Sequence, residues 1–141
     1  MHFGLRFDFR NPEIAGTTMA DRYAAALDIA EWADGLGCTS IAVSEHHASP
    51  DGYLPSPIAM LAAMAARTTD VGFLIAALIA PFHDPLRLAE DMIVLDILSR
   101  GRVDLILDGG VILNQPSTVI DLSGPSPVVL REGKGPVPGP G

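Results

Sequence analysis

VGFLIAALI, residues 71–79, is a nearly continuous apolar run. Such a run is typical of a strand that is buried on both faces, as in a parallel sheet covered by helices. Shortly after it, Asp84 and Pro85 provide an N-cap followed by proline at the first helical position. This signal predicts a helix that begins at Pro85 and ends near residues 99–101. The two segments together predict one strand–helix unit of an α/β protein.

The same order of strand and helix recurs on the amino-terminal side of this unit. Thr18 with Asp21 provides a capping pair for one helix, and Ser56 before Pro57 provides an N-cap for another. Strands that alternate with helices predict right-handed βαβ units and a parallel sheet. The remaining predicted elements are strand 2–9, helix 21–36, strand 39–43, helix 57–67 and strand 103–107.

The pattern changes after residue 107, where no helical periodicity follows. Residues 117–122 and 127–131 favour strands, and the segment between them is rich in serine, glycine and proline. We therefore expect a short β-hairpin tail over 108–133, with residues 134–141 disordered. An isolated hairpin is marginally stable, so we expect it to dock beside strand 103–107.

Composition and charge exclude several classes of protein. The 141 residues carry a net charge of −8, which argues against a general nucleic-acid partner. Cys38 is the single cysteine, which fits a reducing compartment. The longest apolar stretch, residues 71–82, is too short to span a bilayer, and charge interrupts the apolar amino terminus. We expect a cytoplasmic protein with no membrane partner.

Glu45, His46 and His47 directly follow strand 39–43. In a βα-barrel the carboxyl ends of the strands form the active site, and histidine serves as a general base near neutral pH. Side-chain alternation directs His46 and His47 differently, so at most one of them faces a shared pocket. A polar loop that satisfies exposed backbone groups explains the same residues equally well. A metal site is disfavoured, because adjacent histidines chelate poorly.

Four stretches of the chain carry a resemblance to a known family: FGLRFDF (3–9), LDIAEWADGLGCTSIAVSEHHAS (27–49), PSPIAMLAAMAARTTD (55–70) and IAALIAPFHDPLRLAEDMIVLDILSRGR (75–102). Residues 1 to about 105 resemble the luciferase-like monooxygenase superfamily. The resemblance implies a (β/α)8, or TIM, barrel that binds a reduced flavin-type cofactor, FMN or a deazaflavin, at the carboxyl ends of its strands. Residues 1–107 supply about four parallel βα units, so we expect a partial barrel.

The resemblance also implies roles for single residues. His46 matches the histidine that serves as the catalytic acid/base group near the flavin ring. Glu45 matches the neighbouring acid, which we assign to cofactor binding. Ala76 and Ala77 match a strand pair that forms a non-prolyl cis peptide behind the flavin ring in some members. The alternative for this pair is an ordinary trans segment of a buried strand.

The tail carries a second resemblance, centred on PSTVIDL (116–122) and VVLREG (128–133). It resembles the carboxyl-terminal end of the threonylcarbamoyl-adenylate synthase family, in which the pair matching Ser117 and Thr118 lies close to a nucleotide pocket. The other walls of that pocket have no counterpart in this chain, so the tail is not expected to work as a synthase. The two resemblances together predict a composite chain.

Two functions remain open from the sequence. The first is a truncated or composite luciferase-like oxidoreductase that acts on a small-molecule substrate, with weak or no activity alone. The alternative is a non-catalytic αβ domain that self-associates through its open sheet edge, because an open parallel sheet leaves unpaired backbone groups. The open sheet edge leads us to expect a homo-oligomer, such as a dimer.

Overall fold

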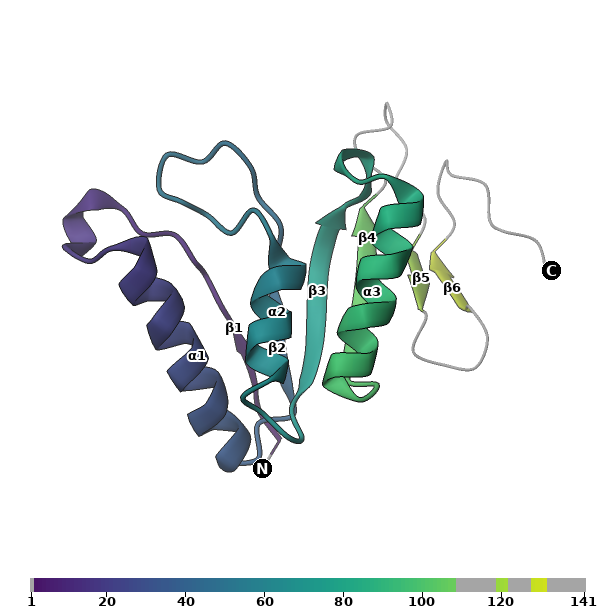
Figure 1. Ribbon diagram of the computed structural model, residues 1–141, viewed down its shortest axis with the longest axis horizontal. Coiled ribbons are helices and arrows are strands. Elements are labelled where there is room, and N and C mark those ends of the chain that lie inside the picture. The colour runs from purple at the N-terminus through teal and green to yellow at the C-terminus, as the bar shows by residue number, and fades with distance from the viewer. Residues whose placement is uncertain (1, 109–118, 122–127, 132–141) are drawn as a thin grey trace.

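A parallel sheet of four strands organises the protein, in the order β1-β2-β3-β4 (Figure 1). The computed structural model describes residues 2–108, 119–121 and 128–131. The strands are β1 (Gly4–Arg6), β2 (Ser40–Val43), β3 (Gly72–Ile79) and β4 (Val103–Asp108). All three pairings are parallel. The predicted α/β class and parallel strand direction are confirmed, whereas the closure of these strands into part of a barrel stays a prediction.

Three helices lie on one face of this sheet, each following the strand before it (Figure 1). They are α1 (Met19–Gly35), α2 (Pro57–Ala65) and α3 (Pro85–Ser99), with short 3-10 turns η1 (Glu13–Ala15) and η2 (Ala80–Phe82). No helix in the described part of the chain is both long and apolar enough to cross a membrane. The opposite face carries no helix among the described residues, and we call it the helix-free face.

Most element boundaries differ from the sequence prediction by one or two residues, and two of the differences have a clear physical reason. Helix α1 begins at Met19 rather than residue 21, because Thr18 is its N-cap and forms a complete capping box with Asp21. Strand β1 covers only Gly4–Arg6 of the predicted 2–9, because β2, its single neighbour, offers only a short run of partners. Asp84 caps α3 as predicted, by accepting the Arg87 N–H.

The core lies between the sheet and the helices. Alternate residues of β2 and β3 are directed to the helices and are fully buried, whereas their neighbours Ala42, Leu74 and Ala76 are only partly buried and belong to the helix-free face. The buried strand residues are Ile41, Val43, Phe73, Ile75 and Leu78, and they pack with Ala30, Ala33, Leu61, Met64 and Leu95 of the helices.

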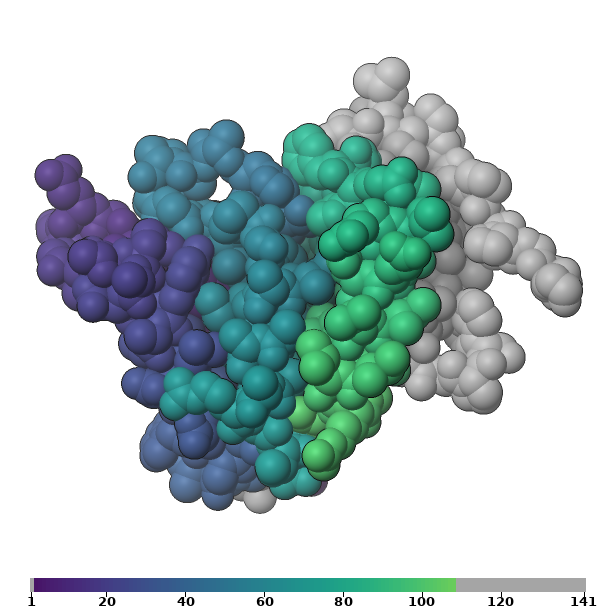
Figure 2. All heavy atoms as spheres, viewed as in Figure 1, coloured from purple at the N-terminus to yellow at the C-terminus, as the bar shows by residue number. Residues whose placement is uncertain are grey.

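The outer face of α3 is unusually apolar. Leu86, Ile93, Val94, Ile97 and Leu98 are each between 54% and 70% exposed. Figure 2 shows α3 at the surface of the molecule. Association into a homo-oligomer would cover such a face. The homo-oligomer stays a prediction.

The tail contributes two short strands, β5 (Val119–Asp121) and β6 (Val128–Arg131). They pair antiparallel, as expected for a hairpin, and β5 lies beside β4 (Figure 1). Of the predicted strand 117–122, the structure describes residues 119–121. Ser117, Thr118 and residues 134–141 lie outside the described residues.

Charged side chains hold the loops at the amino-terminal edge of the sheet. Arg102 donates to the carbonyl oxygens of Ser99 (2.6 Å) and Val71 (2.8 Å), and its guanidinium lies 5.1 Å from the centre of the Phe73 ring. Arg102 therefore ties the loop before β4 to the loop before β3. The sequence analysis did not single it out, because its partners are loop carbonyls that carry no sequence signal.

Asp34, near the end of α1, holds the start of β3. Its carboxylate accepts the backbone N–H groups of Thr69 (2.7 Å), Asp70 (3.1 Å) and Val71 (2.7 Å). Partial burial raises the pKa of this carboxyl, but the backbone N–H groups outweigh it and hold the pKa below its ordinary value. The ionised form of Asp34 therefore stabilises the folded protein.

We expect Asp34→Asn to lower the free energy of unfolding at pH 7 by about 1–3 kcal/mol, because an amide leaves one of these N–H groups facing another donor. Since the folded pKa lies below the unfolded one, the contribution of Asp34 is present above about pH 3.8 and is lost as the pH falls further. Urea denaturation at several pH values measures this. Asp28→Asn, an exposed carboxylate of the same helix, is the control. An equal loss for both variants would contradict the prediction.

Candidate functional site

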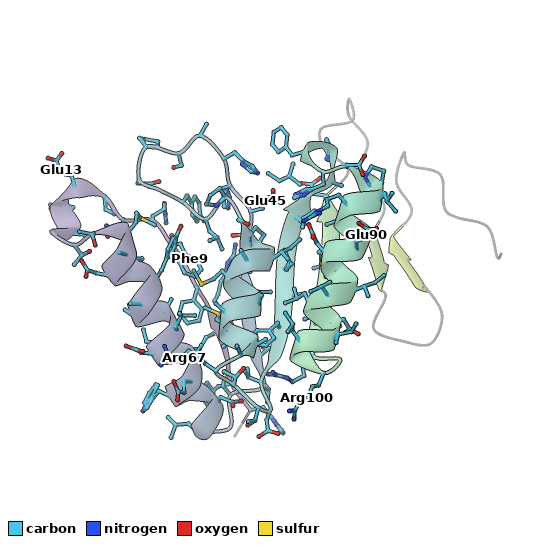
Figure 3. The ribbon with its side chains drawn as sticks, viewed as in Figure 1. Phe9, Glu13, Glu45, Arg67, Glu90 and Arg100 are labelled. Carbon is cyan, nitrogen blue, oxygen red and sulfur yellow. The ribbon has the colours of Figure 1, made fainter. Side chains whose placement is uncertain are left out.

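The carboxyl ends of the four strands meet at one edge of the sheet, which we call the rim. Because the strands are parallel, Asp8 after β1, His46 after β2 and the η2 turn after β3 all belong to this edge. Figure 3 shows Glu45 at the same edge, above the start of α2. The rim thus gathers titratable side chains from segments that are far apart in the sequence.

His46 is held by three contacts. Its Nε2 lies 3.2 Å from the Ser44 hydroxyl, and its backbone N–H donates to the Leu54 carbonyl at 2.9 Å. Its ring stacks on the Tyr53 ring, with centroids 3.7 Å apart and planes 6° apart. The imidazole is half-buried. One face of the imidazole is therefore covered, and its orientation is fixed from two sides.

Tyr53 links His46 to the end of β1. The Arg10 guanidinium lies 5.4 Å from the centre of the Tyr53 ring and forms an ion pair with Asp8. Hydrogen bonds from the Arg10 side chain and backbone lower the pKa of Asp8 to about 2, so this carboxylate is ionised at neutral pH. A cavity of about 510 Å³ opens beside Asp8 and Arg10. Four of its five lining residues are charged: Asp8, Arg10, Arg22 and Asp51.

Glu45 lies in a different environment from His46. Its side chain has 0% exposure. Its Oε1 accepts from His47 Nε2 at 2.7 Å and from His83 Nε2 at 2.8 Å, and its Oε2 accepts the Ile79 N–H at 2.6 Å. Burial raises the pKa of this carboxyl, but the Ile79 N–H and the two imidazoles outweigh it and hold the pKa below its ordinary value.

The residues predicted from the sequence therefore separate into two groups. His46 contacts Ser44 and Tyr53, whereas His47 contacts Glu45 and the edge of the Phe82 ring. This divergence is what side-chain alternation predicts for adjacent residues. Glu45 and His46 are neighbours in the sequence but share no partner among these contacts.

Two residues of the rim were missed by sequence analysis. His83 follows β3 as His46 follows β2, so the parallel arrangement was a signal that could have identified it. Tyr53 carried no such signal, because it lies in a loop whose path depends on tertiary contacts. No trio of histidine, cysteine or acidic side chains within the described residues has a geometry that could hold a metal ion.

Ala76 and Ala77 lie in β3 close to the rim. The peptide bond between them is cis, which the resemblance raised for this pair. The register between β3 and β4 shifts between Ala76 and Leu78. Ala76 and Ala77 are both partly buried, and Ala76 belongs to the helix-free face with Ala42.

A parallel sheet with reactive side chains at its carboxyl ends is typical of βα proteins that form their sites there. Residues 1–115 match the family described as luciferase-like monooxygenase. The match spans most of the chain, and the protein belongs to this family.

Two curated proteins are similar in sequence to this chain over 90 and 88 residues. An uncharacterized protein, y4wF, of Sinorhizobium fredii is 39% identical over 90 residues, which are 64% of this chain and 26% of that protein. The oxygenase component of the flavin-dependent trigonelline monooxygenase of Acinetobacter baylyi is 32% identical over 88 residues, 62% of this chain and 24% of that protein. The chain thus spans about a quarter of the length of these curated relatives.

A solved structure is similar to this chain in its three-dimensional fold as well. The oxygenating constituent of 3,6-diketocamphane monooxygenase from Pseudomonas putida, a type II Baeyer-Villiger monooxygenase in complex with FMN, aligns with a TM-score of 0.70 at 27% identity. The alignment covers 79% of this chain and 30% of that one. The resemblance of the tail to threonylcarbamoyl-adenylate synthases stays a prediction.

We expect Tyr53→Leu to shift the ring protons of His46 downfield in NMR spectra, because the stacked aromatic ring that shields them is lost. Tyr53→Phe keeps the ring and serves as the matched control, with shifts close to those of the parent. Unchanged His46 shifts in Tyr53→Leu would show that the two rings do not stack in solution.

Proposed function

We propose that this chain forms part of the site of a flavin-dependent monooxygenase, with a reduced flavin bound at the rim on the helix-free face. We further propose that β1 to β4 correspond to four units of a partial (β/α)8 barrel. The observation that carries the proposal is the position of His46 at the carboxyl end of β2, in a chain that belongs to the luciferase-like monooxygenase family. FMN is the favoured cofactor, because a structurally similar relative binds it, and a deazaflavin is the alternative.

The described residues fit the ring system of a flavin. A planar tricyclic ring needs a flat wall and a hydrogen-bonding group near its edge. Ala42 and Ala76 lie on adjacent strands and have only methyl side chains, so a ring can approach these two positions closely, with Leu74 and Arg6 paired beside Ala42. His46 lies four residues after Ala42, past the end of β2. If side chains continue to alternate, it belongs to the same face as Ala42.

A reduced flavin supplies the electrons for reductive activation of oxygen. The residues of this chain hold the ring and move a proton. The His46 imidazole is the acid/base group, oriented by the Ser44 hydroxyl and the Tyr53 ring. Ala76 and Ala77 form the flat wall against which the flavin ring lies. Glu45 supports this wall by accepting the Ile79 N–H at the end of β3. Because barrel sites draw on the ends of several strands, we expect these four strands to bind flavin weakly by themselves.

Replacement of the wall tests cofactor binding. We expect Ala76→Phe to weaken binding of reduced FMN about tenfold or more, because a benzyl side chain occupies the space proposed for the flavin ring. Anaerobic fluorescence titration with FMN, and in parallel with a 5-deazaflavin, measures the affinity. Ala63→Phe, on an exposed position of α2, is the matched control. Equal affinities for the parent and Ala76→Phe would exclude this face as the flavin site.

Replacement of His46 tests the proton transfer. We expect His46→Ala to lower turnover by roughly 10²–10⁴-fold while changing flavin affinity little, because the group transfers a proton rather than anchoring the cofactor. Oxygen consumption with reduced flavin, compared with the affinity from titration, separates the two effects. Equal turnover by the variant and the parent would remove His46 from the mechanism.

A further inference from the structure

The buried carboxylate of Glu45 determines the state of two histidines. An ionised carboxylate accepts hydrogen bonds and has none to donate. Glu45 Oε1 lies 2.7 Å from His47 Nε2 and 2.8 Å from His83 Nε2. Both Nε2 atoms must therefore carry a hydrogen, since the alternative tautomers would place a lone pair against a negative charge in a buried site.

These contacts join three segments of the rim. His47 belongs to the end of β2, Ile79 to the end of β3, and His83 to the connection between η2 and α3. The backbone N–H of Glu45 also donates to the Ala77 carbonyl at 3.3 Å. Glu45 therefore holds the end of β3 through its main chain and its side chain, directly after the register shift between Ala76 and Leu78.

We propose that Glu45 is a positioning residue, whose carboxylate fixes His47 and His83 as Nε2–H tautomers and holds the end of β3 beside the flavin wall. Each neutral imidazole then keeps Nδ1 as its proton acceptor. Glu45 acts through these neighbours rather than by touching the cofactor, since its side chain is fully enclosed. The inference deepens the proposed function and rests on it for the statement that the rim is where flavin binds.

The negative charge matters more to this arrangement than the shape of the side chain. A glutamine at position 45 keeps one acceptor oxygen but presents an amide N–H₂ in place of the second oxygen. If the glutamine oxygen accepts from the histidines, its NH₂ group faces the Ile79 N–H, so that two donors meet. In the reverse orientation the NH₂ group faces the N–H groups of both imidazoles. Neither orientation satisfies all three donors.

Long-range ¹H–¹⁵N correlation spectra of the full chain identify the protonated ring nitrogen at about pH 9, where imidazoles are neutral. We expect Nε2–H tautomers for His47 and His83 in the parent protein. In Glu45→Gln we expect mixed tautomers for at least one of them, and amide exchange at Ile79 about tenfold faster. Glu90→Gln, which makes the same change at an exposed carboxylate of α3, should leave both tautomers unchanged.

Two further measurements keep the inference testable if Glu45→Gln does not fold. The parent spectrum alone decides the tautomers, and an Nδ1–H form of either histidine would overturn the proposal. His83→Asn should leave His47 in its Nε2–H form, because the bond to Glu45 does not pass through His83. Unchanged tautomers in folded Glu45→Gln would also overturn it. None of these readouts uses flavin, so failure of the parent to bind flavin would count against the proposed function alone.

Discussion

Side-chain alternation along β2 is the constraint on which the rim depends. Ile41 and Val43 are directed into the core between the sheet and the helices, and a one-residue slip would expose both. Directly after the strand, Ser44 and Glu45 are both buried, whereas His46 is half-buried and His47 is exposed. The register of two apolar side chains in β2 thus fixes where this polar segment leaves the sheet.

The two edges of the sheet use charge in different ways. At the amino-terminal edge, Asp34 and Arg102 satisfy backbone groups of the loops, so their charges serve stability. At the rim, Glu45 gathers imidazoles and His46 rests on a single hydroxyl and an aromatic ring. This division agrees with the general behaviour of βα proteins, in which one edge stabilises the fold and the other carries the chemistry.

Periodicity and capping signals predicted the parts of the fold that depend on local sequence. The apolar run at 71–79 gave β3, Asp84 gave the start of α3, and alternation gave the divergence of His46 and His47. Contacts that join distant segments were not accessible in this way. Tyr53 reaches His46 through the path of a loop, and His83 reaches Glu45 only after β2 and β3 pair. The overlong prediction for β1 has the same origin, since the strand extends only over its three pairs with Ser40, Ile41 and Ala42 of β2.

The helix-free face sets the limit on what these strands can do alone. Among the described residues, a flavin ring placed against Ala42 and Ala76 would have protein contacts on one face only, so these residues would bury only part of its apolar area. In that arrangement His46 would still transfer a proton, but water would reach the reacting ring and weaken every electrostatic interaction around it. Under the proposed function, proton transfer at His46 and exclusion of water are therefore separable requirements, because the first depends on one oriented side chain and the second on cover over the whole ring.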